Sequence, residues 1–116
     1  MVRRRNKHTY EGMYIIRATL SDDARNKAVE KITSLIASLE GEVHKIIDWG
    51  RKKLKYEIKS SREGHYFIIY FSAYSDTVRE MWNEYHLHED LIRFFTLQID
   101  EVPEANEITF KPLVEV

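Results

Sequence analysis

The chain has no cysteine, and it has only four glycines and two prolines among 116 residues. The absence of cysteine excludes disulfides, thiolate zinc sites and cysteine nucleophiles, and it is compatible with a reducing compartment. Four glycines are too few for a glycine-rich phosphate cradle, and the sequence contains neither a Walker A loop nor a GxGxxG motif. These absences exclude cysteine-dependent enzymes and the common nucleotide-binding enzymes.

Long apolar runs are also missing. No segment approaches the ~18 consecutive apolar residues that a membrane span needs, and the arginine-rich start lacks the apolar stretch of a signal peptide. The length suits one compact domain. We therefore expect a soluble, single-domain, cytosolic protein that does not bind membranes.

The formal net charge of −1 conceals a segregation of charge along the chain. Residues 1–62 hold 15 Lys and Arg against 8 Asp and Glu, a net of +7, whereas residues 63–116 hold 3 against 11, a net of −8. Such asymmetry is typical of a basic surface that meets phosphate and an acidic surface that meets water or a basic protein. The alternative is that folding interleaves the two halves and mixes their charges.

Extended and helical patterns alternate along the chain. Strands are predicted at residues 10–18, 42–59, 65–74 and 91–99, with a bend at 48–50 in the second and a turn at 60–64. Ser21 and Gly41 are the expected N-terminal and C-terminal caps of a first helix, and Ser75 and Asp76 begin a second. The apolar stripes of the two helices have helical spacing (Ala28, Ile32, Leu35, Ile36, Leu39; Val78, Met81, Trp82, Tyr85).

The order βαββαβ predicts an α+β, ferredoxin-like two-layer sandwich, in which two helices cover one face of a four-stranded antiparallel sheet. We assign residues 10–99 to this domain, residues 1–9 to a basic N-terminal arm and residues 100–116 to an acidic, partly ordered C-terminal tail. Strand 65–74 is apolar on both faces, so we expect an aromatic patch on the face without helices. Alternatively, tyrosines and threonines keep that face adequately wet.

No catalytic or metal-binding constellation is present. His86 and His88, beside Glu89 and Asp90, lack a separated third ligand set, so we interpret them as a surface turn. Asp48 precedes a Trp-Gly bend and is interpreted as a turn former rather than a general base. We predict that the protein is not an enzyme and that it uses no metal, cofactor or small-molecule substrate.

Four cations and two large rings lie within residues 48–56, around the bend. Lysine and arginine attract phosphate, and exposed rings stack on unpaired bases, so this segment favours RNA binding. The alternative is a solvated cationic strand with Trp49 and Tyr56 in the core, which we prefer for the rings taken singly. The basic arm adds Arg3, Arg4, Arg5 and Lys7.

The segment Asp-Trp-Gly-Arg-Lys-Lys-Leu-Lys-Tyr-Glu-Ile, residues 48–58, resembles the signature of the S6 family of bacterial small-subunit ribosomal proteins. Tyr10-Glu11, Gly64-His65-Tyr66 and Leu91-Ile92-Arg93 match the family at three strand starts, so the resemblance spans about residues 10–99. The chain departs from the family pattern at Glu57, where proline is frequent, in a less basic fourth strand and in a longer basic arm.

The resemblance implies a ferredoxin-like fold and a structural role in the small ribosomal subunit. It also implies binding to the central domain of the small-subunit ribosomal RNA and pairing with ribosomal protein S18. The RNA-binding residues that we predict are Arg3, Arg4, Arg5, Trp49, Arg51, Lys52, Lys53, Lys55 and Arg93.

Two other functions fit the same topology. A generic RNA-recognition-motif domain has a strand-three signature that residues 62–70 match only loosely, with glycines in the wrong places. A homodimeric ferredoxin-like enzyme would bury its open sheet faces around a small-molecule cavity, and that hypothesis leaves the basic segment without a role.

Overall fold

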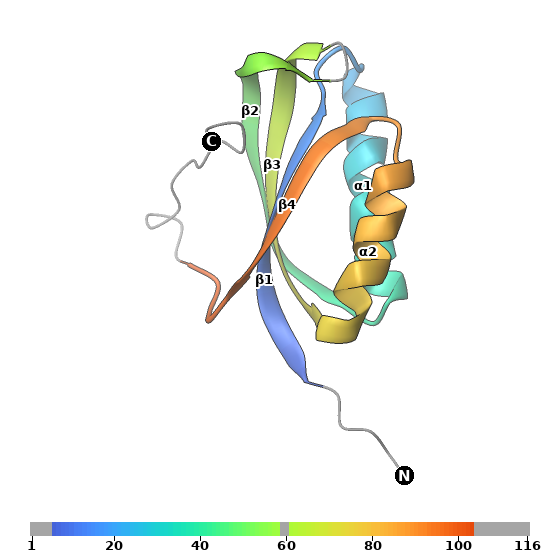
Figure 1. Ribbon diagram of the computed structural model, residues 1–116, viewed down its shortest axis with the longest axis vertical. Coiled ribbons are helices and arrows are strands. Elements are labelled where there is room, and N and C mark those ends of the chain that lie inside the picture. Colours follow the sequence, from blue (N-terminus) through green and yellow to red (C-terminus); the bar gives the residue numbers. More distant parts are fainter. Residues whose placement is uncertain (1–5, 59–60, 104–116) are drawn as a thin grey trace.

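The computed structural model describes residues 6–58 and 61–103. Its elements are β1 (Lys7–Arg17), α1 (Asp22–Ser38), β2 (Glu42–Ile58), β3 (Ser61–Tyr74), α2 (Ser75–Leu87) and β4 (Leu91–Ile99). The strands form one antiparallel sheet in the order β2-β3-β1-β4, and both helices lie on one face of it (Figure 1). This arrangement confirms the predicted ferredoxin-like sandwich.

Helix α1 begins as predicted and ends differently. The Ser21 hydroxyl oxygen accepts a hydrogen bond from the Ala24 N–H at 3.2 Å, which is the geometry of an N-cap. At the other end the left-handed residue is Glu40, with φ of 64°, and not the predicted Gly41. Gly41 is needed for a different reason, because a Cβ there would lie 2.7 Å from Ile36 Cγ2 and 2.8 Å from the Ile36 carbonyl oxygen.

Two strand boundaries differ from the prediction. β1 begins at Lys7, so residues 7–9, assigned to the arm, pair with Tyr74, Ala73 and Ser72 of β3. β2 continues beyond residues 48–50, and the register shift between Asp48 and Gly50 confirms the predicted bend there. β3 begins at Ser61, inside the predicted turn. These strand ends could not be predicted from the alternation of apolar and polar residues, because polar and charged residues occupy both faces there.

Side chains pack on both faces of the sheet. On the helix side, even-numbered residues of β1 and odd-numbered residues of β3 join α1, α2 and the start of β4 in one core. This helix-side core contains Tyr10, Tyr14, Ile16, Ala28, Ile32, Ile36, Phe67, Ile69, Phe71, Ala73, Met81, Tyr85 and Leu91. On the opposite side a second core contains Met13, Ile15, Leu54, Tyr66, Ile68, Tyr70 and Ile92. The central strands β1 and β3 are therefore buried on both faces.

The second core corrects the expectation of an exposed aromatic patch. Met13, Ile15, Tyr66, Ile68 and Tyr70 are each at most 3% exposed. Partly buried residues of β2 and of the segment after β4 pack around them, including Ile58 and Val102. The buried Tyr70 hydroxyl donates to Glu11 Oε2 at 2.8 Å, which satisfies its hydrogen bond within the protein.

Two tyrosines hold α2 to β1 inside the helix-side core. The hydroxyl oxygens of Tyr14 and Tyr85 are 3.0 Å apart, and their rings meet edge to face with centroids 5.3 Å apart. Burial raises the pKa of Tyr85 to about 12 and raises the pKa of Tyr14 well above its usual range. The apolar stripe of α2 is otherwise narrower than predicted, because Trp82 is 42% exposed.

The helix stripe generates a first prediction. Replacing Ile32 by Ala should lower the free energy of unfolding by about 2 to 5 kcal/mol, because Ile32 is 1% exposed and the shorter side chain leaves a cavity in the core. Leu35→Ala should cost less, since Leu35 is only partly buried. Chemical denaturation measures both. Ser34→Ala, at an exposed position of α1, is the matched control, and an equal loss there would contradict the assigned packing.

The tyrosine pair generates a second prediction. A raised pKa means that the folded state holds the phenol proton more tightly, so this stability is present below pH 10 and is lost as the pH rises toward about 12. The double variant Tyr14→Phe, Tyr85→Phe removes both hydroxyls and should be nearly as stable as the parent at pH 8. Its loss of melting temperature between pH 8 and pH 11 should be smaller. Identical alkaline losses in the two proteins would exclude the pair as the cause.

Candidate nucleic-acid interface

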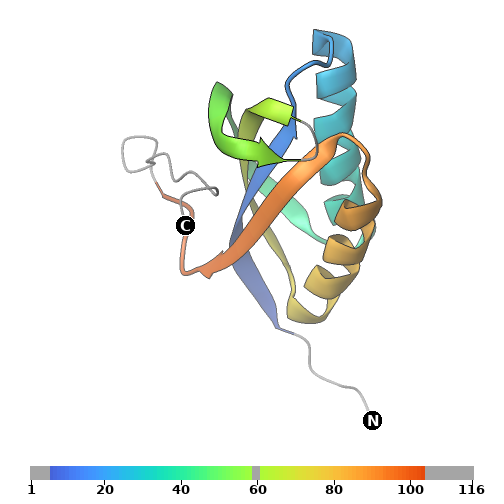
Figure 2. The same ribbon diagram turned by 45° about the horizontal axis from the view of Figure 1, so that its top comes forward.

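The basic segment forms one strand of a hairpin at the end of the sheet. Beyond Gly50, whose φ is 83°, β2 pairs with the first residues of β3, from Arg51↔His65 to Lys53↔Glu63. The end of β2 then bends over, as Figure 2 shows, and Leu54 is buried while Ile58 is partly buried in the second core. The hairpin is therefore anchored to the body of the protein by apolar contacts.

Four of the predicted RNA-binding residues lie together on this hairpin. Arg51, Lys53 and Lys55 are exposed, and they alternate with the half-buried Lys52 and the buried Leu54. This period of two confirms the predicted strand with one wet, charged side. Within the described residues, Lys53 and Lys55 have no ion pair, so their charges face solvent.

Carboxylates on the same hairpin reduce its positive charge. Arg51 Nη2 lies 3.1 Å from Glu63 Oε2, and Arg62 Nε lies 3.8 Å from Glu57 Oε2. All four side chains are at least 43% exposed, so each pair contributes little to stability. Residues 51–63 still hold six cations against two anions, a net of +4. Arg62, absent from the predicted set, belongs to this surface because β3 begins at Ser61, within the predicted turn.

Asp48 shapes the bend that precedes the hairpin. Its Oδ1 accepts a hydrogen bond from the Gly50 N–H at 2.8 Å and lies 2.6 Å from His65 Nε2 on β3. The His65 ring in turn stacks on Phe67, with centroids 4.8 Å apart. Asp48 is thus the predicted turn former, and it also joins the two strands where the register shifts.

The two rings of the basic segment have different surroundings. Trp49 is partly buried against the second core, which agrees with the interpretation preferred for a single ring. Tyr56 is 51% exposed, so its expected place in the core is wrong. The register shift between Lys53 and Ile58 explains the difference, because residues 54–57 leave the regular ladder.

Arg93 lies on the same face as Trp49, across the sheet. The ladder places Gly50 of β2, Tyr66 of β3, Ile15 of β1 and Arg93 of β4 in one row. Burial raises the pKa of Tyr66, and the positive charge of Arg93 opposes that effect. The half-buried Arg93 therefore belongs to the end of the sheet that carries the hairpin.

The basic arm is not brought to the hairpin over the part that the structure describes. Lys7 pairs with Tyr74 at the far end of β3, and its Nζ lies 5.2 Å from the centre of the Tyr74 ring. Arg3, Arg4 and Arg5 lie outside the described residues. The strand order β2-β3-β1-β4 places strands of the basic half and of the acidic half side by side in the sheet. The charges are nevertheless not fully mixed, because the cations of the hairpin lie together at one end of the sheet.

The histidine pair near the end of α2 is divided between surface and core. His86 is exposed and lies edge-on to Phe94, with centroids 5.0 Å apart. His88 is 6% exposed, and its Nε2 lies 3.2 Å from the Ala28 carbonyl oxygen, so its assignment to a surface turn is wrong. Among residues 6–58 and 61–103, no group of three side chains has the composition of a metal site, and no helix is long and apolar enough to cross a membrane.

Comparisons with known proteins agree on one family. A family model described as ribosomal protein S6 matches residues 9–98. The small ribosomal subunit protein bS6 of Protochlamydia amoebophila is 52% identical over 109 residues, which cover 94% of each chain. The bS6 protein of Chlamydia pneumoniae is 49% identical over 94% of this chain and 97% of its own.

A solved structure supports the same assignment. The crystal structure of 30S ribosomal protein S6 from Thermotoga maritima aligns with a TM-score of 0.76 at 30% identity, and the alignment covers 81% of this chain and 89% of that one. These relatives are named as ribosomal proteins and not as enzymes, which confirms the prediction of a non-catalytic chain. The chain, a ribosome-associated protein of the cytoplasm, belongs to the ribosomal protein S6 family of the small subunit.

Proposed function

We propose that this protein binds the central domain of the small-subunit ribosomal RNA through the β2–β3 hairpin, in partnership with ribosomal protein S18. The observation that carries the proposal is the exposed cation row of Arg51, Lys53 and Lys55 on a hairpin that the second core anchors. Membership of a ribosomal protein family supports RNA as the polyanion.

The chemistry of the row fits phosphate contacts better than base readout. Lysine ammonium groups on flexible stems act as point charges, whereas base readout uses side chains that are fixed in a defined plane. Arg51 pairs with Glu63 through Nη2, and its guanidinium retains further donors for a phosphate. Trp49 and Arg93 border this surface on the sheet face, where they would meet unpaired bases or further phosphates. Arg3, Arg4 and Arg5 complete the proposed set of RNA-binding residues.

A third prediction tests the phosphate contacts. The affinity for central-domain RNA should fall as the salt concentration rises. The double variant Lys53→Gln, Lys55→Gln should flatten the slope of log K against log salt by about 1 to 2, because with two contacts fewer the RNA releases fewer counterions on binding. Filter binding at several salt concentrations measures the slope.

The matched control is Lys27→Gln, Lys31→Gln, which removes two exposed lysines from α1 on the helix layer. This control should leave the slope unchanged. If both double variants flatten the slope equally, the effect is one of net charge, and the hairpin is not the RNA-binding surface.

A fourth prediction concerns the partner. RNA should bind far more tightly to this protein and S18 together than to this protein alone, because a partner that adds cations and orders the joint surface removes part of the cost of association. The acidic second half of the chain, with a net of −8, would orient a basic partner. The measurement is a titration of central-domain RNA with each protein alone and with both. Equal affinities with and without S18 would overturn the cooperative model.

A further inference from the structure

The two edges of the sheet differ in how they are protected. β2, at one edge, carries charged residues along its whole length and has three register shifts. β4, at the other edge, has the sequence Leu-Ile-Arg-Phe-Phe-Thr-Leu-Gln-Ile, with one charged residue and no proline. Sheet edges in stable proteins normally carry charges, prolines or bulges that prevent further pairing. The protections of β4, Arg93 and one register shift against β1 at Ile15/Ile16, both lie near its start, and residues 94–99 have no charge, proline or register shift.

Apolar side chains are exposed along this unprotected edge. Phe95 is 52% exposed and Leu97 is 43% exposed, although both belong to a strand that packs on the cores. Trp82 of α2 is 42% exposed, and its indole N–H donates to Thr96 Oγ1 at 3.1 Å, which fixes the ring beside the strand. Among the residues that the structure describes, β4 pairs only with β1.

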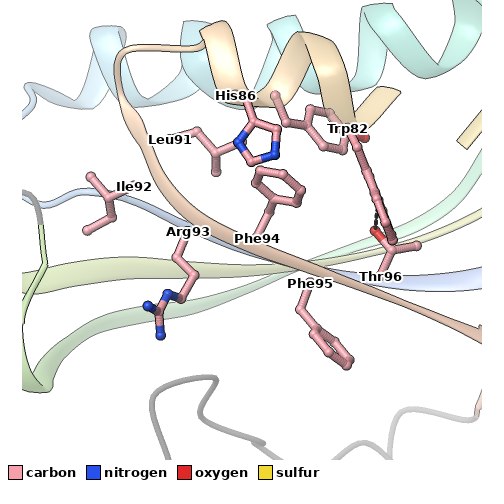
Figure 3. Close-up of a pocket in the computed structure, with 9 residues that line it drawn as sticks. Trp82, His86, Leu91, Ile92, Arg93, Phe94, Phe95 and Thr96 are labelled. Carbon is pink, nitrogen blue, oxygen red and sulfur yellow. Dashed lines mark hydrogen bonds between the residues drawn. The ribbon is translucent and has the colours of Figure 1, made fainter. Parts of the chain in front are cut away.

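A groove of about 470 Å³ follows the same edge, between β4 and α2. Figure 3 shows Trp82, His86 and Phe94 on the helix side of β4, whereas Arg93 and Phe95 project from the opposite side. A strand added along β4 would therefore place alternate side chains against Trp82 on one face and against Phe95 on the other. Backbone pairing with alternate side-chain pockets is the usual mode of strand addition.

Acidic pairs stand at both ends of the strand. Glu89 and Asp90 immediately precede β4, and Asp100 and Glu101 immediately follow it. Three of these side chains are exposed and Asp90 is half-buried, and within the described chain none of the four is in an ion pair. The edge thus has an apolar centre with negative charge at each end.

From this combination we infer that β4 and the α2–β4 groove dock an extended segment of a protein partner, about nine residues long, with an apolar centre and lysine or arginine at both ends. The charges complement the acidic pairs in either strand direction, because those pairs are at both ends. The site lies on the opposite edge of the sheet from the proposed RNA-binding hairpin. Of the proposed RNA-binding residues that the structure describes, Arg93 alone lies on β4, and the variants below leave it unchanged, so each proposal can fail alone.

A second copy of this chain fits the edge poorly. Antiparallel pairing of β4 with itself along its full length sets Leu91 opposite Ile99, and it then sets Asp90 opposite Asp100 and Glu89 opposite Glu101. Like charges placed directly opposite one another destabilise a pairing. The same charges that favour a basic partner therefore disfavour self-association.

The probe is a synthetic peptide of nine alternating valines and threonines with two lysines at each end. A second peptide has glutamates in place of the lysines, and a third has a central proline, which removes a backbone donor. Each is titrated into the full-length ¹⁵N-labelled protein while amide exchange of residues 91–99 is followed. We expect the lysine peptide to slow exchange in β4 and to bind about tenfold more tightly than the glutamate peptide. The proline peptide should bind more weakly than the lysine peptide.

Two edge variants are matched. Phe95→Lys adds a charge to β4 and should abolish binding, whereas Ile46→Lys, on β2 at a position 47% exposed, should not. A further variant, Asp100→Asn with Glu101→Gln, leaves the strand intact and should lose most of the preference for lysine over glutamate. If a thermal melt shows that Phe95→Lys is unstable, the comparison of the peptides and the Asp100→Asn, Glu101→Gln variant still test the inference.

Four results would overturn the inference. The first is no protection of β4 amides by the lysine peptide up to about 1 mM. The second is equal binding by the Phe95→Lys and Ile46→Lys variants. The third is self-association that Phe95→Lys abolishes, which would make a second copy the occupant. The last is protection of β4 by central-domain RNA alone, which would assign this edge to RNA.

Discussion

The antiparallel pairing of β1 with β3 determines which side chains of the central strands face the helices and which face the second core. Each residue of β1, from Lys7 to Arg17, has a partner on β3, from Tyr74 back to Gly64. Because the side-chain period of a strand is two, a slip of one residue would exchange the helix-side core with the second core. Both sets are apolar but differ in shape, and only one register seats Tyr14 beside Tyr85 and Tyr70 beside Glu11.

Burial on both faces of the central strands gives the molecule two cores, and the second one supports the candidate site. Leu54 and Ile58 pack into it, so the cations that alternate with them are presented from an anchored hairpin. A flexible loop would have to be ordered when RNA binds, at a cost in conformational entropy. An anchored row bears less of that cost, while its lysine stems stay free to adjust to phosphate positions.

The fold was predictable because long amphipathic patterns and a helix cap in the sequence indicate the positions of most helices and strands. The stripe of α1, the Ser21 cap, the two-faced strand β3 and the β2 alternation around Leu54 all appear as predicted. The errors arose where local pattern and tertiary structure diverge. Glu40 adopts the left-handed conformation, and Gly41 passes close to Ile36 and Ser72, a tertiary approach that no local capping rule contains. The buried His88 lies with its Nε2 3.2 Å from the Ala28 carbonyl oxygen of α1, a contact between residues 60 positions apart that no local pattern indicates.

The candidate site was predicted in part for the same reason. Residues adjacent in sequence, from Arg51 to Lys55, could be grouped from the chain alone, and the structure places them on one hairpin. The position of Arg93 in a row with Gly50 depends on the strand order β2-β3-β1-β4, which brings together residues more than forty positions apart. The ion pairs of Arg51 with Glu63 and of Arg62 with Glu57 could be predicted only if the start of β3 was known. The unprotected β4 edge could be recognised only once that strand was known to be outermost.

The place of β1 between β3 and β4 also determines when this protein can fold during its own synthesis. β1 is the first strand to be made, yet both of its neighbours are made later, and β4 ends only at Ile99. At translation rates of about 5 to 20 residues per second, the apolar residues of β1 wait for several seconds without their sheet partners. Because Leu91 and Ile92 of β4 belong to the two cores, the nascent chain cannot complete either core until β4 has emerged.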